Sequence, residues 1–298
     1  MNRSILSIIF ATVITVSAIA QAPEGKYTAF TGKGQASSID EIMKSLANAD
    51  VVFLGELHDD AVAHAIQLEI FKRAIEQYGA KRKVTLSMEM FERDVQTVLN
   101  EYLAGQISEN HFLLSSRPWP AYKTDYRPLV ELAKEKKLDV VAANAPRRYV
   151  NMVSRNGRDS VNGLSKQAKE WLAPLPYAEP SEAYSKKFKA LMGSSPEAMM
   201  GIDKILSSQS LWDATMAYSV AESLKKNKGS LVVHLNGGFH TENRLGTVEH
   251  FLKYRKKGRV LVVTMRYVNE FKKFDAAKDA DAGDFVILTD AKEPRSKR

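Results

Sequence analysis

The 298-residue sequence contains no cysteine, and this absence excludes several classes of protein. Without cysteine the fold has no disulfide and depends on its own hydrophobic core. Covalent c-type haem, iron–sulfur clusters and thiol nucleophiles are excluded for the same reason. A bacterial lipoprotein needs a lipobox cysteine, so we do not expect a lipid anchor of that kind.

The sequence also lacks two common catalytic motifs, and it contains no nucleic-acid-binding motif. His240-Thr241-Glu242-Asn243-Arg244 resembles the zinc motif His-Glu-x-x-His only superficially, and no Gly-x-Ser-x-Gly nucleophile elbow occurs. The formal net charge of +8 favours an anionic ligand or an anionic membrane surface. We expect no nucleic-acid partner, because basic charge alone does not make a nucleic-acid-binding protein.

Residues 1–22 are expected to be a signal peptide. Arg3 gives a basic start, an apolar run follows, and Ala18-Ile19-Ala20 supplies the small-x-small pattern that signal peptidase recognises. The run is shorter than the roughly 20 residues of a membrane span. We expect cleavage after Ala20 or Ala22 and a periplasmic or extracellular protein; a retained N-terminal anchor is the alternative.

We expect residues 23–290 to form a single α/β domain. Residues 291–298 are expected to be a disordered basic tail. Helical patterns at Ala61–Tyr78, where Asp59 or Asp60 can cap the start, and at Thr124–Lys137 separate the early strands. This alternation predicts a largely parallel central sheet flanked by helices. The expected strands are short, apolar and nearly continuous, as in sheets covered on both faces: 51–55, 84–90, 140–143, 231–235, 260–265 and 285–289.

No strand pattern occurs between about residues 155 and 221. Pro174, Pro176 and Pro180 punctuate the beginning of this segment, and helical patterns carrying several methionines follow. We interpret it as a helical insertion over the carboxyl ends of the strands. Its apolar residues fit an ordinary helical core as well as the wall of a ligand site.

Polar side chains follow almost every predicted strand. Parallel sheets bind ligands beyond the carboxyl ends of their strands, so we expect these side chains to converge at one edge. The alternative is that they cap helices and pair with one another. In strand order, the candidates are Glu56 and His58, then Glu89, then Arg147, Arg148 and Tyr149, and then His240.

The pattern Gly-x-x-His occurs twice, from Gly55 to His58 and from Gly237 to His240. Glycine adopts backbone conformations that other residues avoid. Each glycine is therefore expected to let the chain turn sharply off its strand and bring the histidine back over the strand end.

Several blocks of the sequence resemble the ChaN-like family of exported bacterial haem-binding proteins, over about residues 50 to 265. They are Gly55-Glu56-Leu57-His58-Asp59, Glu89-Met90-Phe91-Glu92-Arg93-Asp94, Tyr126-Arg127-Pro128-Leu129, Ala142-Ala143-Asn144-Ala145-Pro146-Arg147 and Trp212-Asp213-Ala214-Thr215-Met216-Ala217. The family is similar to a superfamily that includes Tiki-type metalloproteases and erythromycin esterases. One block departs from the family: Phe239 separates Gly238 from His240, where Gly-x-Gly-His is usual.

The resemblance implies non-covalent haem binding for iron acquisition, with the iron held through a tyrosine and a histidine nearby. Some relatives form dimers with stacked haems, so a haem-linked homodimer is implied, as is an outer-membrane haem receptor as partner. Ferric iron accepts phenolate or imidazole, and arginine suits the propionates. The candidate cofactor-binding residues are Tyr149 as first and Tyr126 as second choice of ligand, with His58, His64, Arg147, Arg148 and His240; His64 also fits a packed position on an apolar helix stripe.

The alternative hypothesis is a hydrolase, a protease or an esterase, at the same edge. His58 and His240 with Glu56 or Glu89 would hold a divalent metal such as Mn, Co or Zn. Arg147 would then stabilise developing negative charge. A metal-free version would use a histidine as general base, aided by a carboxylate. Haem binding is the primary hypothesis, and it assigns no catalytic residue.

Overall fold

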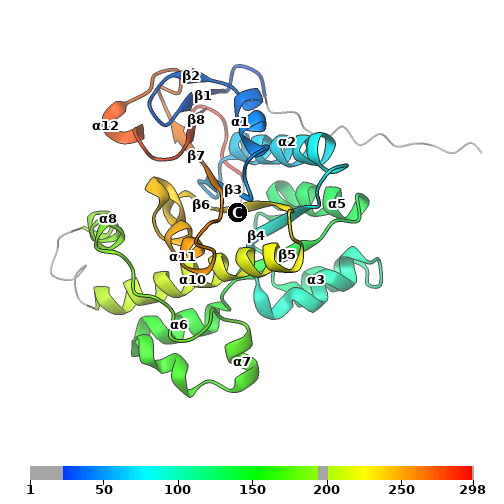
Figure 1. Ribbon diagram of the computed structural model, residues 1–298, viewed down its shortest axis with the longest axis vertical. Helices are drawn as coiled ribbons and strands as arrows, with labels where there is room; N and C mark the ends of the chain where they lie inside the picture. Colours follow the sequence, from blue (N-terminus) through cyan, green and yellow to red (C-terminus); the bar gives the residue numbers. More distant parts are fainter. Residues whose placement is uncertain (1–22, 194–200, 297–298) are drawn as a thin grey trace, which may run out of the picture.

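The computed structural model describes residues 23–193 and 201–296, and the expected signal peptide lies outside them. Within these residues no helix is long and apolar enough to span a membrane. An eight-stranded sheet forms the centre, in the order β2-β1-β8-β7-β3-β6-β4-β5 (Figure 1). Its strands are β1 (Tyr27–Thr31), β2 (Ala36–Ser37), β3 (Val51–Glu56), β4 (Val84–Glu92), β5 (Val140–Asn144), β6 (Leu231–Gly237), β7 (Val260–Val268) and β8 (Phe285–Asp290).

The sheet is largely parallel and flanked by helices, which confirms the predicted fold class. All six predicted strands are present, and β3 to β8 pair in parallel with one another. The sequence did not predict β1 and β2, which add an antiparallel edge beside β8. These two strands are short and only half-buried, so the continuous apolar pattern of a covered strand is absent from them.

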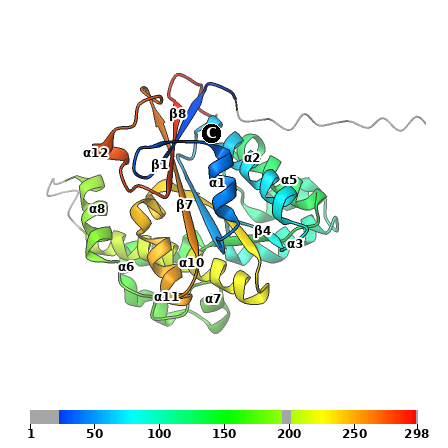
Figure 2. The same cartoon turned by 45° about the horizontal axis from the view of Figure 1, so that its top comes forward.

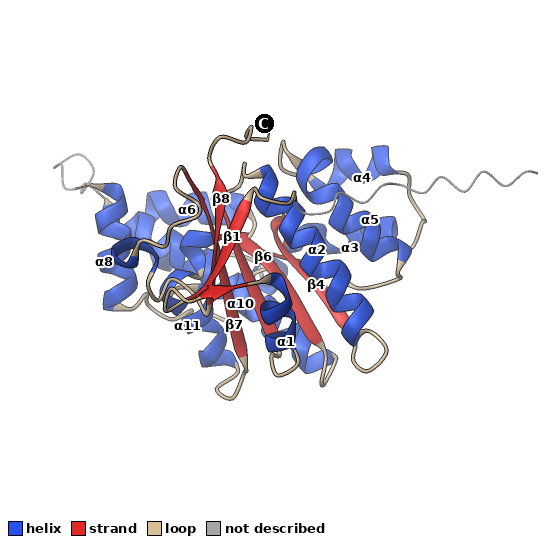
Figure 3. Ribbon diagram, turned by 90° about the horizontal axis from the view of Figure 1, so that it is seen from above, coloured by secondary structure: helices blue, strands red, loops and turns tan. Residues whose placement is uncertain are grey.

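Helices cover both faces of the sheet (Figure 3). In β3, Val52 and Leu54 pack into a cluster with residues of α1, α2 and α5. Val51 and Phe53 point to the opposite face, against α10 and α11. Because successive side chains of a strand alternate between faces, a strand covered on both sides must be apolar throughout. The nearly continuous apolar runs have this cause.

The helix bounds follow local capping signals. Asp60, one of the two expected caps of α2, accepts from the backbone N–H groups of Val62 and Ala63 at 3.1 Å each. Pro128 lies in the first turn of α5, where its missing N–H costs no hydrogen bond. The helices before β5 are α1 (Ile39–Leu46), α2 (Ala61–Tyr78), η1 (Arg93–Val95), α3 (Gln96–Leu103), α4 (Glu109–Ser116), the π-helical η2 (Tyr122–Tyr126) and α5 (Arg127–Glu135).

Between β5 and β6 the described residues form helices and loops. The longest helix, α10, packs on the sheet, while α6 and α7 lie on the far side of α10 from the sheet (Figures 1 and 2). This segment contains α6 (Arg147–Asn156), η3 (Arg158–Gly163), α7 (Lys166–Glu170), α8 (Glu182–Met192) and α10 (Ile202–Lys226); η4 (Gly238–His240), η5 (Glu242–Arg244), α11 (Thr247–Tyr254) and α12 (Ala276–Asp279) follow β6.

The segment after β8 differs from the expected disordered tail. Arg295 pairs with Asp59 at 3.2 Å, and Ser296 donates from its hydroxyl to Asp125 at 2.8 Å. The backbone N–H of Ser296 also donates to the carbonyl of Asp59. Residues 291–296 are therefore held against the loop after β3 by charge and hydrogen bonds, which the polar composition alone did not reveal.

Candidate functional site

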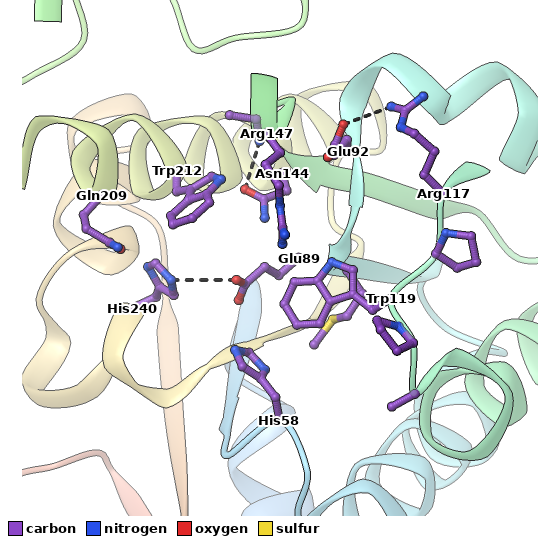
Figure 4. Close-up of a pocket in the computed structure, with 15 residues that line it drawn as sticks. His58, Glu89, Glu92, Arg117, Trp119, Asn144, Arg147, Gln209, Trp212 and His240 are labelled. Carbon is purple, nitrogen blue, oxygen red and sulfur yellow. Dashed lines mark hydrogen bonds and ion pairs between the residues drawn. The ribbon is translucent and has the colours of Figure 1, made fainter. Parts of the chain in front are cut away.

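A pocket of about 600 Å³ opens at the carboxyl ends of β3, β4, β5 and β6 (Figure 4). His58, Glu89, Arg147 and His240 all line it, so four of the side chains singled out by the strand-end argument meet there. The other lining residues are Met90, Glu92, Arg117, Pro118, Trp119, Pro120, Ala121, Asn144, Ala145, Gln209 and Trp212.

His58 is held by a buried carboxylate. Its Nδ1 donates to Oε1 of Glu56 at 2.9 Å, and its other nitrogen, Nε2, is left on the pocket side (Figure 4). The side chain of Glu56 is fully buried and also accepts from Tyr126 at 2.6 Å and from Gln67 at 2.7 Å. His64 lies 3.5 Å from the same carboxylate. This network fixes the orientation of the His58 ring.

His240 forms a second imidazole–carboxylate pair across the pocket. Its Nδ1 donates to Oδ1 of Asp213 at 2.8 Å, and its Nε2 lies 3.7 Å from Glu89. The side chain of Asp213 is fully buried and also accepts from Thr247 at 2.7 Å. Figure 4 shows Glu89 between the two histidines, with His58 on one side and His240 on the other.

The carboxylates decide the charge of both histidines. Burial alone lowers the pKa of His58, but Glu56 and Glu89 outweigh it and the pKa rises above its usual 6.5. Burial likewise opposes protonation of His240, yet Asp213 and Glu89 raise its pKa to about 9. Burial raises the pKa of Glu56, but the histidines reverse this and hold it below its usual value. The site therefore favours imidazolium beside carboxylate.

The glycines of the two Gly-x-x-His patterns provide space rather than sharp turns. Neither has a positive φ, which corrects the expected role. A Cβ on Gly237 would stand 2.9 Å from Nε2 of His58 and 3.7 Å from Cδ2 of His240. A Cβ on Gly55 would stand 2.9 Å from the Cα of Gly238. Gly237 thus makes room for the imidazoles, and Gly55 allows two chain segments to approach closely.

Two tryptophans form opposite walls of the pocket. Trp119, from a loop bracketed by Pro118 and Pro120, meets the His58 ring edge-to-face with centroids 4.8 Å apart. Trp212, from α10, meets the His240 ring edge-to-face at 6.3 Å. Both indoles are partly exposed. Each histidine therefore lies between a carboxylate and an indole, and the walls offer flat apolar surface to a ligand.

Arg147 supplies the uncompensated positive charge of the pocket. It is exposed at the start of α6 and forms no ion pair with any of the residues that the structure describes. Arg117, in contrast, pairs with Glu92 at 2.9 Å and with Asp94 at 2.8 Å. Since the positive end of a helix dipole adds to its guanidinium charge, Arg147 is suited to a ligand carboxylate.

Four other predicted cofactor residues lie outside the pocket lining. Tyr126 is buried with its hydroxyl on Glu56, and burial together with the Glu56 charge raises its pKa far above the usual 10.0. His64 is buried between Glu56 and Asp125, 3.4 Å from the latter. Arg148 pairs with Asp94 at 2.5 Å. The Tyr149 ring is half-buried, with the Arg148 guanidinium 4.5 Å away and the Trp171 ring stacked at 6.5 Å.

Sequence reasoning missed three contributors to the site. Asp213 and Trp212 lie within the 25-residue α10, where a strand-end argument does not reach. Trp119 lies in the loop before η2, far in sequence from any strand end. A polar residue within an otherwise buried helix face would have been a signal for Asp213, because a buried carboxylate needs a partner.

The side chains do not form the metal site that the alternative hypothesis required. Within residues 23–193 and 201–296, no group of three or more His, Asp and Glu side chains is arranged to hold a metal ion. The expected ligands have other partners instead: Glu56 pairs with His58, and Glu89 accepts from the backbone N–H of Gly237 at 2.7 Å. The metal-dependent version of the hydrolase hypothesis is therefore not supported.

The fold and the pocket define an α/β protein with a ligand site at the carboxyl edge of a parallel sheet. Residues 42–251 match the family described as haem-binding uptake, Tiki superfamily, ChaN, and the chain belongs to this family. The family match supports haem binding.

A solved structure shares the fold. A structure described as cofacial heme binding to ChaN of Campylobacter jejuni is similar with a TM-score of 0.69 and 20% identity, over 89% of this chain and 98% of that chain. An erythromycin esterase mutant is more distant, with a TM-score of 0.47 and 11% identity over 81% of this chain and 77% of that chain.

A curated relative comes from a plant. Protein RETICULATA-RELATED 5, chloroplastic, of Arabidopsis thaliana is 24% identical over 218 residues, which are 67% of this chain and 28% of that protein. The chain therefore spans little more than a quarter of that relative.

Proposed function

We propose that this chain captures haem non-covalently in the pocket beside His58, outside the cytoplasm, as a step in haem or iron acquisition. Family membership supports the choice of ligand. The observation that carries the site is the geometry of His58, whose Nδ1 is fixed by Glu56 while Nε2 remains on the pocket side. Export and delivery to an outer-membrane receptor belong to the same proposal and rest on the N-terminal sequence and the family.

His58 is the residue that would bind the haem iron. Metal-ligating histidines usually donate their second ring N–H to a carboxylate, which fixes the ring and raises its basicity. The pair of His58 and Glu56 has this arrangement, and the His58 side chain keeps 35% of its surface exposed. His240 is less suited, because its side chain is only 9% exposed and its Nε2 faces Glu89 at 3.7 Å. Haem iron, when bound, would supply the Lewis acid that Nε2 of His58 coordinates.

The remaining walls fit the two kinds of surface on haem. Trp119 and Trp212 offer apolar faces to a porphyrin ring, since flat aromatic surfaces stack and exclude water. Arg147, which has no ion pair among the described residues, would pair with a propionate carboxylate. Asn144 lines the same side as Arg147 and adds an amide. The chain thus offers an imidazole, an apolar slot and a cation in one cavity.

Tyr149, the first choice of ligand from the sequence, becomes the second candidate and lies on a different surface. Its ring lies at the start of α6 with Arg148 and Trp171 and does not line the pocket. A haem there would be held at the surface of α6, where a second chain could cover it. Cofacial haem binding is named for the Campylobacter protein, and a haem-linked homodimer of this chain would use this surface.

A metal-free hydrolase is the second candidate function. The specific observation that favours it is the presence of two imidazole–carboxylate pairs, Glu56 with His58 and Asp213 with His240, around one pocket. His58, held by Glu56, would act as the base once it has lost its proton, and His240, whose pKa is raised to about 9, would act as the acid. Arg147 would stabilise an oxyanion. Among the residues that the structure describes, no serine or threonine lines the pocket, so water would be the nucleophile.

The deciding experiment is a hemin titration followed by absorption spectroscopy. The wild-type chain, His58→Ala, Tyr149→Phe and the control His111→Ala would be compared; His111 is exposed on α4, away from the pocket lining. We expect a saturable Soret shift in the wild type and the control. His58→Ala should weaken binding about tenfold or more and remove the imidazole signature.

Two other outcomes would redirect the proposal. Loss of a tyrosinate charge-transfer band in Tyr149→Phe, with His58→Ala unchanged, would move the haem to the surface of α6. An unsaturable change in every variant would reject haem binding. Hydrolysis of p-nitrophenyl esters that depends on His58 and His240, without any Soret shift, would establish the second candidate in its place.

A further inference from the structure

The C-terminal segment, residues 291–296, reaches the turn that carries His58. It leaves the end of β8 (Figure 3), and the backbone N–H of Ser296 donates to the carbonyl of Asp59 at 2.9 Å. The guanidinium of Arg295 pairs with the Asp59 carboxylate at 3.2 Å. Asp59 follows His58 directly in the chain. The end of the chain is therefore bonded to the residue next to the proposed iron ligand.

The C-terminal segment is also fixed at its start. The backbone N–H of Ala291 donates to the carbonyl of Val268, the last residue of β7, at 3.0 Å. The hydroxyl of Tyr267 faces the carbonyls of Ala291 at 2.9 Å and Glu293 at 2.5 Å. The Glu293 carboxylate pairs with Lys26 at 2.6 Å. Because both of its ends are held, the segment forms a strap between the edge of the sheet and the loop after β3.

A second contact of the strap leads into the interior. The hydroxyl of Ser296 donates to Oδ1 of Asp125, whose side chain is only 4% exposed. Oδ2 of Asp125 lies 3.4 Å from Nε2 of His64, which also lies 3.3 Å from the carbonyl oxygen of His58. Burial opposes protonation of His64, but Glu56 and Asp125 outweigh it and raise the pKa. His64 therefore donates from both ring nitrogens.

His64 in turn contacts the carboxylate that orients His58. Its Nδ1 lies 3.1 Å from Oε1 of Gln67 and 3.5 Å from Oε2 of Glu56. The amide of Gln67 donates to the same Glu56 oxygen at 2.7 Å, and the other oxygen accepts from Nδ1 of His58 at 2.9 Å. A continuous series of polar contacts therefore joins Ser296 to the ring of His58, and most of its members are buried, where a lost partner is costly.

The two elements that the strap joins both hold His58. Asp59 lies in the loop after β3, whereas Asp125 lies in η2, whose Tyr126 donates to Glu56 at 2.6 Å. The distances from His64 to Asp125 and Glu56, 3.4 and 3.5 Å, are at the long end for a hydrogen bond, so a small separation of the two elements would break these contacts. The strap limits that separation, because it is bonded to both.

We propose that the C-terminal segment is a positioning element of the haem site, which holds His58 in the orientation that binds iron. Ser296 and Arg295 are its positioning residues, since neither lines the pocket. The contact of Ser296 with the buried Asp125 should matter more than the pair of Arg295 with Asp59, because solvent screens a half-exposed ion pair. The inference rests on the proposed function, in which His58 is the axial ligand. Such a ligand must be held to within a fraction of an ångström.

The first test observes His58 in the full chain without haem, by NMR of histidine side chains labelled with nitrogen-15. The Nδ1–H proton of His58 is shielded by its hydrogen bond to the buried Glu56. In the double variant Arg295→Gln/Ser296→Ala, its exchange with water should rise about tenfold through local opening. Exchange of the Asp60 amide, which donates to the carbonyl of Leu57 in the same turn, should rise with it. The urea midpoint should stay that of the wild type, since no core residue changes.

Two matched variants separate a specific contact from a general effect. Lys292→Gln removes a positive charge from the same segment, at an exposed lysine that forms no ion pair with residues 23–193 or 201–296. It should behave as the wild type. Ser296→Thr retains the hydroxyl that donates to Asp125, so it should also keep the slow exchange at His58, whereas Ser296→Ala alone should lose most of it.

A hemin titration of the same variants distinguishes this inference from the proposed function. We expect the double variant to bind hemin about tenfold more weakly, with a reduced imidazole signature. Faster exchange at His58 without any change in hemin binding would retain the positioning role and reject His58 as the iron ligand. Unchanged exchange at His58, or an equal effect of Lys292→Gln, would overturn the positioning role whatever the hemin result.

Discussion

Glu89 accepts the backbone N–H of Gly237 through one oxygen, at 2.7 Å, and faces Nε2 of His240 with the other, at 3.7 Å. The end of β4 is thereby joined to the end of β6, and a negative charge is fixed between two imidazoles. The charge of Glu89 contributes to the raised pKa of both His58 and His240.

Replacing Glu89 by glutamine is expected to lower the pKa of both pocket histidines. The amide oxygen can still accept from Gly237, so the strand ends should stay joined while the charge is lost. A decrease of about one pKa unit is expected for each imidazole, measured by NMR titration of the histidine side chains. Glu92→Gln is the control, because Glu92 lines the same pocket but pairs with Arg117. Equal shifts in both variants would contradict a specific role of Glu89.

Gly237→Ala is expected to impair ligand binding more than folding. The new Cβ would meet Nε2 and Cε1 of His58 at 2.9 Å, and a side-chain ring can move away. We expect a loss of stability of about 1 kcal/mol and a fall in hemin affinity of about tenfold, because a ligand displaced by an ångström no longer fits. Gly163→Ala, where nothing lies within 4 Å of the added Cβ, is the matched control.

Gly55→Ala tests whether the two glycines have different roles. Its added Cβ would meet the Cα of Gly238, and backbone cannot yield as a side chain does. Gly55→Ala should therefore lower the free energy of unfolding by more than Gly237→Ala does. If chemical denaturation gives the two variants equal stability, the different roles assigned to the two glycines are wrong.

The sequence predicted the parallel strands because burial on both faces leaves a clear apolar run, as in Val51 to Leu54. It also predicted α2 with its bounds, since Asp60 and the helical spacing agree. The half-buried β1 lacks such a run. Because the strands are parallel, the sequence also predicted the edge of the sheet at which Glu89 and His240 meet.

The sequence did not predict the contacts that form only through tertiary packing. Asp213 reaches His240 from a helix 27 residues earlier in the chain, and no local pattern marks that pairing. Tyr149 was chosen for its place after a strand and Tyr126 for its block of family resemblance; only packing shows that Tyr126 is buried on Glu56 and that Tyr149 lies beside Trp171. The C-terminal contact of Ser296 with Asp125 is likewise long-range.

The pair of Asp213 and His240 is expected to make stability depend on pH. The pKa of His240 is raised from 6.5 to about 9. Its contribution to the free energy of unfolding is therefore complete below pH 6.5 and is lost as the pH rises through about 9. The pKa of Asp213 is lowered from 3.8, so its contribution is present above that value and is lost as the pH falls further. Stability should therefore be greatest between these limits and decline on the alkaline side.

Asp213→Asn tests this pair directly. Removing one partner of a buried ion pair leaves the other uncompensated, so we expect a loss of about 3–5 kcal/mol at neutral pH. His240 should then titrate at a lower pH, and the alkaline decline in stability should vanish, as measured by urea denaturation between pH 6 and 10. Asp203→Asn, on the exposed first turn of the same helix, is the control and should follow the wild type. An alkaline decline that persists in Asp213→Asn would assign it to groups other than this pair.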